Sequence, residues 1–161
     1  MMAATHAAAA PIVALGASNT EGRGRGRAAD GVPPSQAYPA QLEALLTARG
    51  CRAAVMNAGV AGDTTEGMLA RLPGVYGADT KVLILQPGGN DARRGASGRA
   101  ENIVAIRDYV KKRGGTFIML DGLGRIASGR RLADGQHFDA GGHAMFARYL
   151  LPRVLGTGVC R

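Results

Sequence analysis

Four short runs of apolar residues recur along the chain and predict four strands. The apolar residues in each run follow one another instead of alternating with polar ones. Such runs are typical of strands covered on both faces of a parallel sheet. The predicted strands cover residues 12–15, 53–56, 82–86 and 117–120.

Helical patterns lie between and after these strands. The first predicted helix ends before Gly50, because glycine commonly terminates helices, and the second stops at Pro73. The pair Gly114-Gly115 ends the third. The predicted helices cover residues 36–49, 64–72, 100–113 and 140–155.

Strands that alternate with helices indicate an α/β fold with right-handed crossovers. The chain has neither internal repeats nor a linker, so we expect one domain over residues 1–161. Ligands of such sheets bind at the carboxyl ends of the strands. The segments that follow the first three strands should therefore meet at one edge of the sheet.

The composition fits a globular protein, with 46% apolar residues and a formal charge of +8. No apolar stretch approaches the roughly 20 residues that a membrane-spanning helix needs. The run Arg23-Gly24-Arg25-Gly26-Arg27 allows a polyanion- or nucleic-acid-binding interpretation as well as a solvated surface. No aromatic residue for base stacking lies near this run, which argues against nucleic acid.

The two cysteines and the first residues bear on the compartment of the protein. Cys51 and Cys160 could form one disulfide or remain two buried thiols. Residues 1–10 lack an intact signal peptide, but they fit a trimmed remnant of one or a disordered start. We expect a periplasmic or secreted protein, with a cytoplasmic one as the alternative.

Candidate catalytic groups lie at both ends of the chain. Ser18 follows the first apolar run, and Asp134 precedes His137 by three residues, close enough to orient its ring. A base and a carboxylate are what a serine hydroxyl needs to become a nucleophile. Taken singly, Ser18 fits a helix cap and His137 a polar turn. Of the other histidines, His6 is expected to be inert and His143 to pack or cap in the last helix.

Two further segments carry hydrogen-bond donors. A tight turn at Gly62 would let a backbone N–H approach a developing oxyanion, and the side chain of Asn90 would supply a second donor. Turn geometry alone also accounts for Gly62, and Asn90 alone could be a capping residue.

In the order Gly16–Thr20, Asn57–Thr65, Gln86–Asp91 and Asp134–His137, these segments resemble the four conserved blocks of the SGNH (GDSL) hydrolases. The similarity to thioesterase/lysophospholipase and arylesterase members is greatest. It implies a three-layer, flavodoxin-like fold without a metal or cofactor. It also implies Ser18 as nucleophile, His137 as base and Asp134 as its acid, with an oxyanion hole made by Ser18, Gly62 and Asn90.

The chain departs from this pattern in three places. Ala17 stands where an Asp is usual, and Phe138 where a Pro is common. The stretch from Leu120 to Asp134 is too short for a helix and a further strand, since a crossover takes about a dozen residues or more before the next strand begins. We therefore expect four strands, or a vestigial fifth, a shallow acyl pocket and a fourth strand whose exposed edge could support a homodimer.

Our main hypothesis is a serine esterase for short-chain acyl esters or thioesters, with a carbohydrate O-acetyl esterase as alternative. A non-catalytic polyanion binder is the alternative from another class. A nucleotide-binding domain is disfavoured, because the second strand ends in Met56-Asn57, whereas dinucleotide-binding domains carry an acidic residue there that hydrogen-bonds the ribose. Several arginines near strand ends could favour anionic substrates or simply be solvated: Arg23, Arg25, Arg27, Arg93, Arg94, Arg130 and Arg131.

Overall fold

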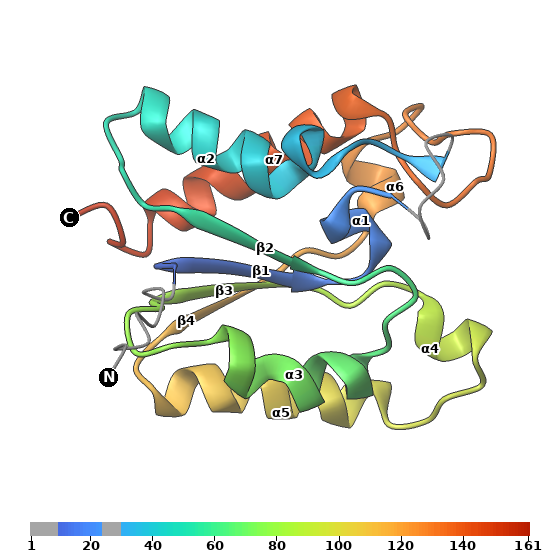
Figure 1. The fold of residues 1–161 in the computed structure, drawn as a ribbon, viewed down its shortest axis with the longest axis horizontal. Helices are drawn as coiled ribbons and strands as arrows, with labels where there is room; N and C mark the ends of the chain where they lie inside the picture. Colours follow the sequence, from blue (N-terminus) through green and yellow to red (C-terminus); the bar gives the residue numbers. More distant parts are fainter. Residues whose placement is uncertain (1–9, 24–29) are drawn as a thin grey trace, which may run out of the picture.

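The computed structural model describes residues 10–23 and 30–161. His6, Arg25, Arg27 and nearly all of the 1–10 segment lie outside these ranges. The chain forms a parallel four-stranded sheet in the order β2-β1-β3-β4 (Figure 1). The strands are β1 (Ile12–Gly16), β2 (Val55–Gly59), β3 (Val82–Gln86) and β4 (Thr116–Met119).

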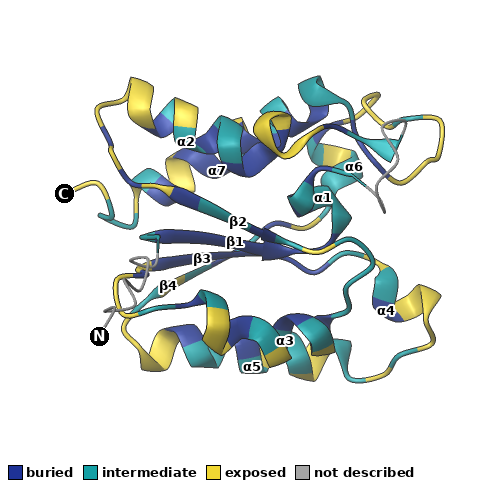
Figure 2. Ribbon diagram, in the orientation of Figure 1, coloured by how far each residue is buried: buried dark blue, intermediate teal, exposed yellow. Residues whose placement is uncertain are grey.

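Helices cover both faces of this sheet and give three layers (Figure 1). One face carries α2 (Tyr38–Ala48) and α7 (Ala140–Leu155), and the other carries α3 (Thr65–Val75) and α5 (Arg99–Lys112). Alternate residues of β1 enter the two cores, Ile12 and Ala14 on the α2/α7 side and Val13 on the other. Figure 2 shows the central strands buried and the outer faces of the helices exposed. The predicted three-layer α/β fold is confirmed.

The register aligns the carboxyl ends of the central strands. Gly16, the last residue of β1, pairs with Gly59 of β2 and with Gln86 of β3. Three segments that leave the sheet at this level are therefore neighbours in space, as the strand–helix alternation predicted. Within the described ranges, none of the helices is long and apolar enough to cross a membrane.

Some predicted element bounds are wrong. β2 begins two residues later than predicted and extends through Asn57 to Gly59. Its last residues are polar or glycine because they contact the serine segment, so the apolar run alone did not mark its end. A Cβ on Gly59 would overlap the backbone of Glu21, so only glycine allows this approach. Helix α3 passes through Pro73 instead of stopping there, and Tyr76 N–H still bonds the Leu72 carbonyl over 2.9 Å.

The remaining helices are single turns that the sequence analysis did not identify. Three or four residues offer too few positions for a helical period to be seen. They are α1 (Ser18–Glu21), η2 (Pro34–Gln36), α4 (Asn90–Arg93) and α6 (Leu123–Ile126). The other small differences are that α2 and α5 start and end within two residues of expectation, and β4 begins one residue early.

The stretch between β4 and α7 is as short as predicted. Over the continuously described residues 30–161 it adds helix α6 and a tight hairpin, but no fifth strand. The hairpin is closed by one isolated antiparallel bridge between Arg131 and Phe138. Strand β4 therefore forms an edge of the sheet, hydrogen-bonded to β3.

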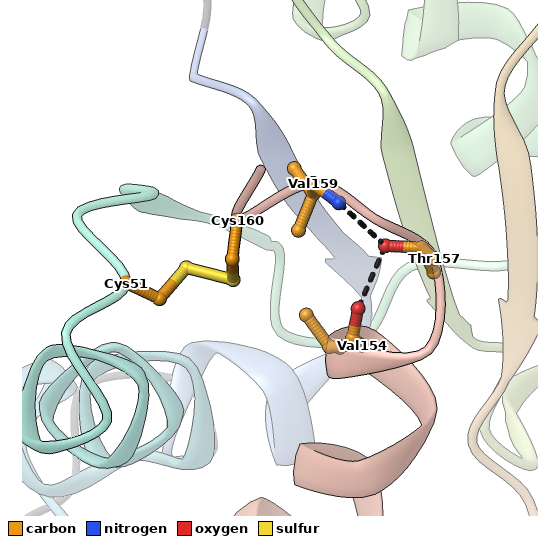
Figure 3. The surroundings of a disulfide bond; sticks show 5 residues. All are labelled: Cys51, Val154, Thr157, Val159 and Cys160. Carbon is orange, nitrogen blue, oxygen red and sulfur yellow. Dashed lines mark hydrogen bonds between the residues drawn. A yellow bond between two sulfur atoms is a disulfide. The ribbon is translucent and has the colours of Figure 1, made fainter.

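Cys51 and Cys160 form a disulfide, which decides between the two alternatives for the cysteines (Figure 3). The bond links the segment before β2 to the chain after α7, across 109 residues of sequence. The Thr157 hydroxyl fixes the intervening turn, donating to the Val154 carbonyl over 2.7 Å and accepting from Val159 N–H over 3.3 Å. The segment before β2 and the chain end after α7 lie at the amino ends of the strands, whereas α1, which begins with Ser18, lies at their carboxyl ends (Figure 1).

Candidate active site

Ser18 is the first residue of α1, and one residue, Ala17, separates it from the end of β1. The turn forms because Thr20 and Glu21 N–H both donate to the Ala17 carbonyl over 3.0 Å. Gly16 has to lack a side chain, since a Cβ there would overlap the Thr20 hydroxyl. The abrupt change from strand to helix presents the Ser18 hydroxyl at the carboxyl edge of the sheet.

The structure brings Ser18, His137 and Asp134 into one hydrogen-bonded row. The Ser18 Oγ lies 2.9 Å from His137 Nε2, across 119 residues of sequence. The other ring nitrogen, His137 Nδ1, lies 2.5 Å from Asp134 Oδ2. An ionised Asp134 can only accept, so Nδ1 carries the proton and Nε2 is left to accept from the Ser18 hydroxyl. This tautomer is the one that a general base requires.

Asp134 is held in its ionised form by its own turn. Its Oδ1 accepts from the backbone N–H of Gln136 over 2.9 Å and of His137 over 3.0 Å. Burial by itself raises the pKa of the Asp134 carboxyl, but these hydrogen bonds, the His137 ring bond and the charge of His137 together lower the pKa to about 2. Asp134 is therefore a carboxylate at neutral pH.

The hairpin that carries Asp134 and His137 is fixed at both ends of its turn. Leu132 N–H donates to the His137 carbonyl over 2.8 Å, and Gly135 adopts φ +69°, a conformation that favours glycine. Asn19, next to Ser18, donates from Nδ2 to the Gln136 carbonyl over 3.2 Å. This last bond ties the serine segment directly to the histidine segment.

Gly62 lies in a tight turn beside the end of β1. Val60 N–H donates to the Gly16 carbonyl over 3.0 Å, and Ala61 N–H to Glu21 Oε2 over 2.7 Å, which anchors the turn to α1. Gly62 itself adopts φ +80°. Its backbone N–H, like that of Ser18, has no hydrogen-bond partner among the described residues. Both donors are therefore available to a bound molecule.

Asn90, the first residue of α4, is fixed between two neighbours. Its Nδ2 donates to the Asp63 carbonyl over 2.8 Å, and its Oδ1 accepts from Arg93 over 2.9 Å. An amide nitrogen carries two hydrogens, so one N–H remains after the bond to Asp63. The candidate oxyanion donors thus come from three separate loops at one edge of the sheet.

Sequence reasoning missed several residues that brace these loops. Asp91 is buried and accepts from both the N–H and the hydroxyl of Thr65, the hydroxyl bond measuring 2.7 Å. Gln86 Oε1 accepts from Ala17 N–H over 3.2 Å and from the Thr20 hydroxyl over 3.1 Å. A polar residue at the end of an otherwise apolar strand was the available signal for Gln86. No comparable signal indicated the contact of Asp91 with Thr65.

A metal site is not evident in the part of the chain that the structure describes. No group of three or more His, Cys, Asp or Glu side chains lies close enough to hold an ion there. His143 lies on the first turn of α7, as predicted, and its Nδ1 is occupied by the backbone N–H of Tyr38 at 3.1 Å. It takes no part in the row of Ser18, His137 and Asp134.

The sheet order, the flanking helices and the four site segments define a hydrolase fold of the SGNH type. A crystal structure of TesA matches with a TM-score of 0.76 at 21% identity, covering 91% of this chain and 98% of that one. The crystal structure of AlinE4, an SGNH-hydrolase family esterase, matches with a TM-score of 0.57 at 30% identity, covering 71% of this chain and 60% of that one.

The chain belongs to the GDSL-like lipase/acylhydrolase family, whose model matches residues 14–144. Among curated proteins, esterase TesA of Pseudomonas aeruginosa is 32% identical over 96 residues, which make up 58% of this chain and 48% of that protein. The match thus spans about half the length of this curated relative. The resemblance drawn from the four segments is confirmed at the level of the family.

Proposed function

We propose that the protein is a serine esterase that hydrolyses short-chain acyl esters or thioesters through a covalent acyl-enzyme. The observation that carries this proposal is the continuous hydrogen-bonded row from Ser18 through His137 to Asp134. Membership in the acylhydrolase family and the similarity to esterase TesA support it.

In the first half-reaction, Ser18 Oγ attacks the carbonyl carbon of the ester while its proton passes to His137 Nε2. Asp134 stabilises the imidazolium that forms. The tetrahedral intermediate collapses, the bond to the alcohol or thiol breaks, and the leaving group takes the proton from His137. The acyl group then remains on Ser18.

In the second half-reaction, water takes the place of the alcohol. It attacks the acyl carbon as His137 takes its proton, and collapse returns that proton to Ser18 and releases the carboxylic acid. In both halves the carbonyl oxygen becomes negatively charged. The Ser18 and Gly62 backbone N–H groups and the second N–H of Asn90 would stabilise this oxyanion.

The preference for short acyl chains follows from the size of the neighbouring cleft. It has a volume of about 280 Å³, and one of its walls is the short segment around α6. This is near the lower end of the roughly 300–1,000 Å³ of small-molecule sites. An acyl chain that exceeds this volume would project into solvent, so we expect rates to fall as the chain lengthens.

The test is hydrolysis of p-nitrophenyl esters of increasing chain length by the wild type and by Ser18→Ala. We expect rates that fall steeply beyond short chains and a variant with almost no activity. Activity at the wild-type level in Ser18→Ala would reject Ser18 as nucleophile.

The two alternative functions are tested in the same way. Acetylated sugars in the same panel test the carbohydrate O-acetyl esterase alternative. Salt-sensitive binding of nucleic acid that survives Ser18→Ala would favour the polyanion binder.

We further propose that the protein works in an oxidising compartment, the periplasm or the outside of the cell. The Cys51–Cys160 disulfide supports this, because disulfides persist there and are rare in the cytosol. Cell fractionation with thiol labelling is the test. A reduced protein recovered from the cytosol would favour the cytoplasmic alternative.

The edge of β4 supports a second proposal, a homodimer in which two copies of this strand pair. Strand β4 is the last strand of the sheet and therefore has one edge without a strand partner, and along it Thr116 is exposed and Phe117 and Met119 are half-buried. Light scattering coupled to gel filtration should then give twice the chain mass. A monomer at high concentration would reject this proposal.

A further inference from the structure

A cleft lies beside the segments that carry the candidate site. It has a volume of about 280 Å³ and includes a direct chain neighbour of each of three site residues. These neighbours are Asn19 beside Ser18, Gly89 beside Asn90, and Gln136 beside His137. A molecule whose ester bond reaches Ser18 would therefore place its remaining atoms in this cleft.

Two arginines line this cleft from separate elements. Arg93 lies at the end of α4, and its NH1 donates to Asn90 Oδ1 over 2.9 Å. Arg131 lies in the hairpin, donates to the Gly135 carbonyl over 2.7 Å and stacks over the Phe138 ring at 5.1 Å. Each guanidinium uses one N–H in these bonds. Neither forms an ion pair with a carboxylate in the described part of the chain.

One carboxylate also lines the cleft and offsets part of the positive charge of the two arginines. Asp121 lies at the start of the α6 segment, and its Oδ1 already accepts from the backbone N–H of Gly122 over 2.7 Å. Two guanidinium groups against one carboxylate leave the lining of the cleft positive. The N–H donors of Arg93 and Arg131 that are not used in hydrogen bonds within the protein remain available to hydrogen-bond an anion in the cleft.

We propose that the preferred substrates are esters that carry an anionic group, bound between Arg93 and Arg131. The proposal rests on the esterase function proposed above. A guanidinium presents a planar set of donors that fits a carboxylate, phosphate or sulfate. Two such groups beside Ser18 would hold the charged end of the ester while its carbonyl reaches the Ser18 hydroxyl.

The chain offers a matched control beside each of these arginines. Arg94 follows Arg93 directly, is exposed and does not line the cleft. Arg130 precedes Arg131 and points elsewhere, with its NH1 3.4 Å from Asp139 Oδ2. Arg23 is bridged to Gly31, away from the lining. Of the arginines that the sequence singled out, only Arg93 and Arg131 among those described reach the cleft.

The experiment compares p-nitrophenyl hemisuccinate with neutral p-nitrophenyl butyrate and uses the ratio of their KM values. Arg93→Gln and Arg131→Gln should each raise the hemisuccinate-to-butyrate ratio by about fivefold, the upper range for an exposed ion pair. Arg94→Gln and Arg130→Gln should leave the ratio unchanged. Asp121→Asn should lower it. A general disturbance of the loops affects both esters and cancels in the ratio.

Esters of a charged alcohol identify which half of the substrate the cleft binds. 4-Acetoxybenzoate carries its carboxylate on the leaving group, whereas the hemisuccinate carries it on the acyl group. An effect of Arg93→Gln and Arg131→Gln on either anionic ester, weakened by added salt, supports the proposal. Equal ratios in all five variants and the wild type would overturn it. If the wild type hydrolyses neither the anionic esters nor neutral p-nitrophenyl butyrate, the proposed esterase function itself fails.

Discussion

The imidazole of His143 caps helix α2, because its Nδ1 accepts a hydrogen bond from the backbone N–H of Tyr38 over 3.1 Å. Tyr38 is the first residue of α2, and no side chain of its own segment caps this end. His143 comes from α7, so the bond joins the two helices that cover one face of the sheet. Its ring also packs edge-on against Phe146 at 5.6 Å. The predicted capping or packing role of His143 is confirmed.

This buried histidine should make the folded state sensitive to acid. Burial lowers the pKa of His143 from 6.5 to about 4, with Asp139 opposing and His137 reinforcing the shift. Between these values the unfolded chain binds the proton and the folded chain does not. The stability is therefore complete above pH 6.5 and is lost as the pH falls toward 4, on the order of 2 kcal/mol by pH 5.

Urea unfolding between pH 7.5 and 4.5 measures this dependence, with His143→Gln as the control. A glutamine oxygen can still accept from Tyr38 N–H but does not titrate in this range. The variant should be less stable than the wild type at pH 7.5 and lose less on acidification. Parallel curves for the two proteins would contradict the assignment.

Removing the Cys51–Cys160 disulfide should lower the free energy of unfolding and leave the catalytic rate unchanged. The bond closes a loop of more than a hundred residues, and loss of a native disulfide typically costs about 2–5 kcal/mol. Because it lies at the opposite end of the sheet from Ser18, kcat at 25 °C should stay the same. Urea unfolding of the wild type with and without dithiothreitol checks the first expectation. The Cys51→Ser/Cys160→Ser protein must be indifferent to the reductant.

Replacing Asn90 by alanine should reduce kcat by about 10²–10³-fold, the usual effect of losing one oxyanion donor. KM should change little, since the donor acts on charge that develops in the transition state. Asn102→Ala is the matched control, because it loses a 3.1 Å bond to the Thr65 hydroxyl in the same region but no donor at the site. Equal losses in both variants would indicate disturbed loops instead.

Replacing Asp134 by asparagine should reduce kcat by about 10⁴-fold, because an amide in place of the carboxylate no longer fixes the tautomer of His137. In the wild type, the pKa of about 2 keeps Asp134 ionised throughout the range above pH 4. Activity of the wild type from pH 4 upward should thus show no step due to this carboxylate. The rate constant of the pre-steady-state release of p-nitrophenol measures the acylation step directly, and a burst at the wild-type rate in Asp134→Asn would be incompatible with its role.

The sheet and the segments of the candidate site were predictable because they leave strong local signals, namely continuous apolar runs and four motif-like blocks. Continuous apolar runs indicated four buried strands, and the first three were each followed by a polar segment at the same edge. The row of Ser18, His137 and Asp134 needed only that these segments meet. By contrast, β2 was placed too early, because its last residues Asn57 and Gly59 are chosen for contacts with α1 and not for burial.

Contacts between loops were not predictable in the same way. Asp91 and Thr65 are 26 residues apart, and no pattern in either segment predicts that the two side chains form a hydrogen bond. The same holds for the arginines. Seven were singled out because they follow strand ends or lie in the loop before Asp134, but only three-dimensional placement separates Arg93 and Arg131, which line the cleft, from Arg94 and Arg130, which do not. Pairing of Cys51 with Cys160 likewise depended on where α7 ends.

The separation of 119 positions between Ser18 and His137 has a consequence for synthesis on the ribosome. The serine is translated together with β1, before the other three strands, while its base is translated only after all four strands of the sheet. A nascent chain therefore carries an unactivated hydroxyl and cannot be acylated through the His137 route before its fold is nearly complete. Gain of activity during translation would report the docking of the last hairpin, and not the formation of the sheet.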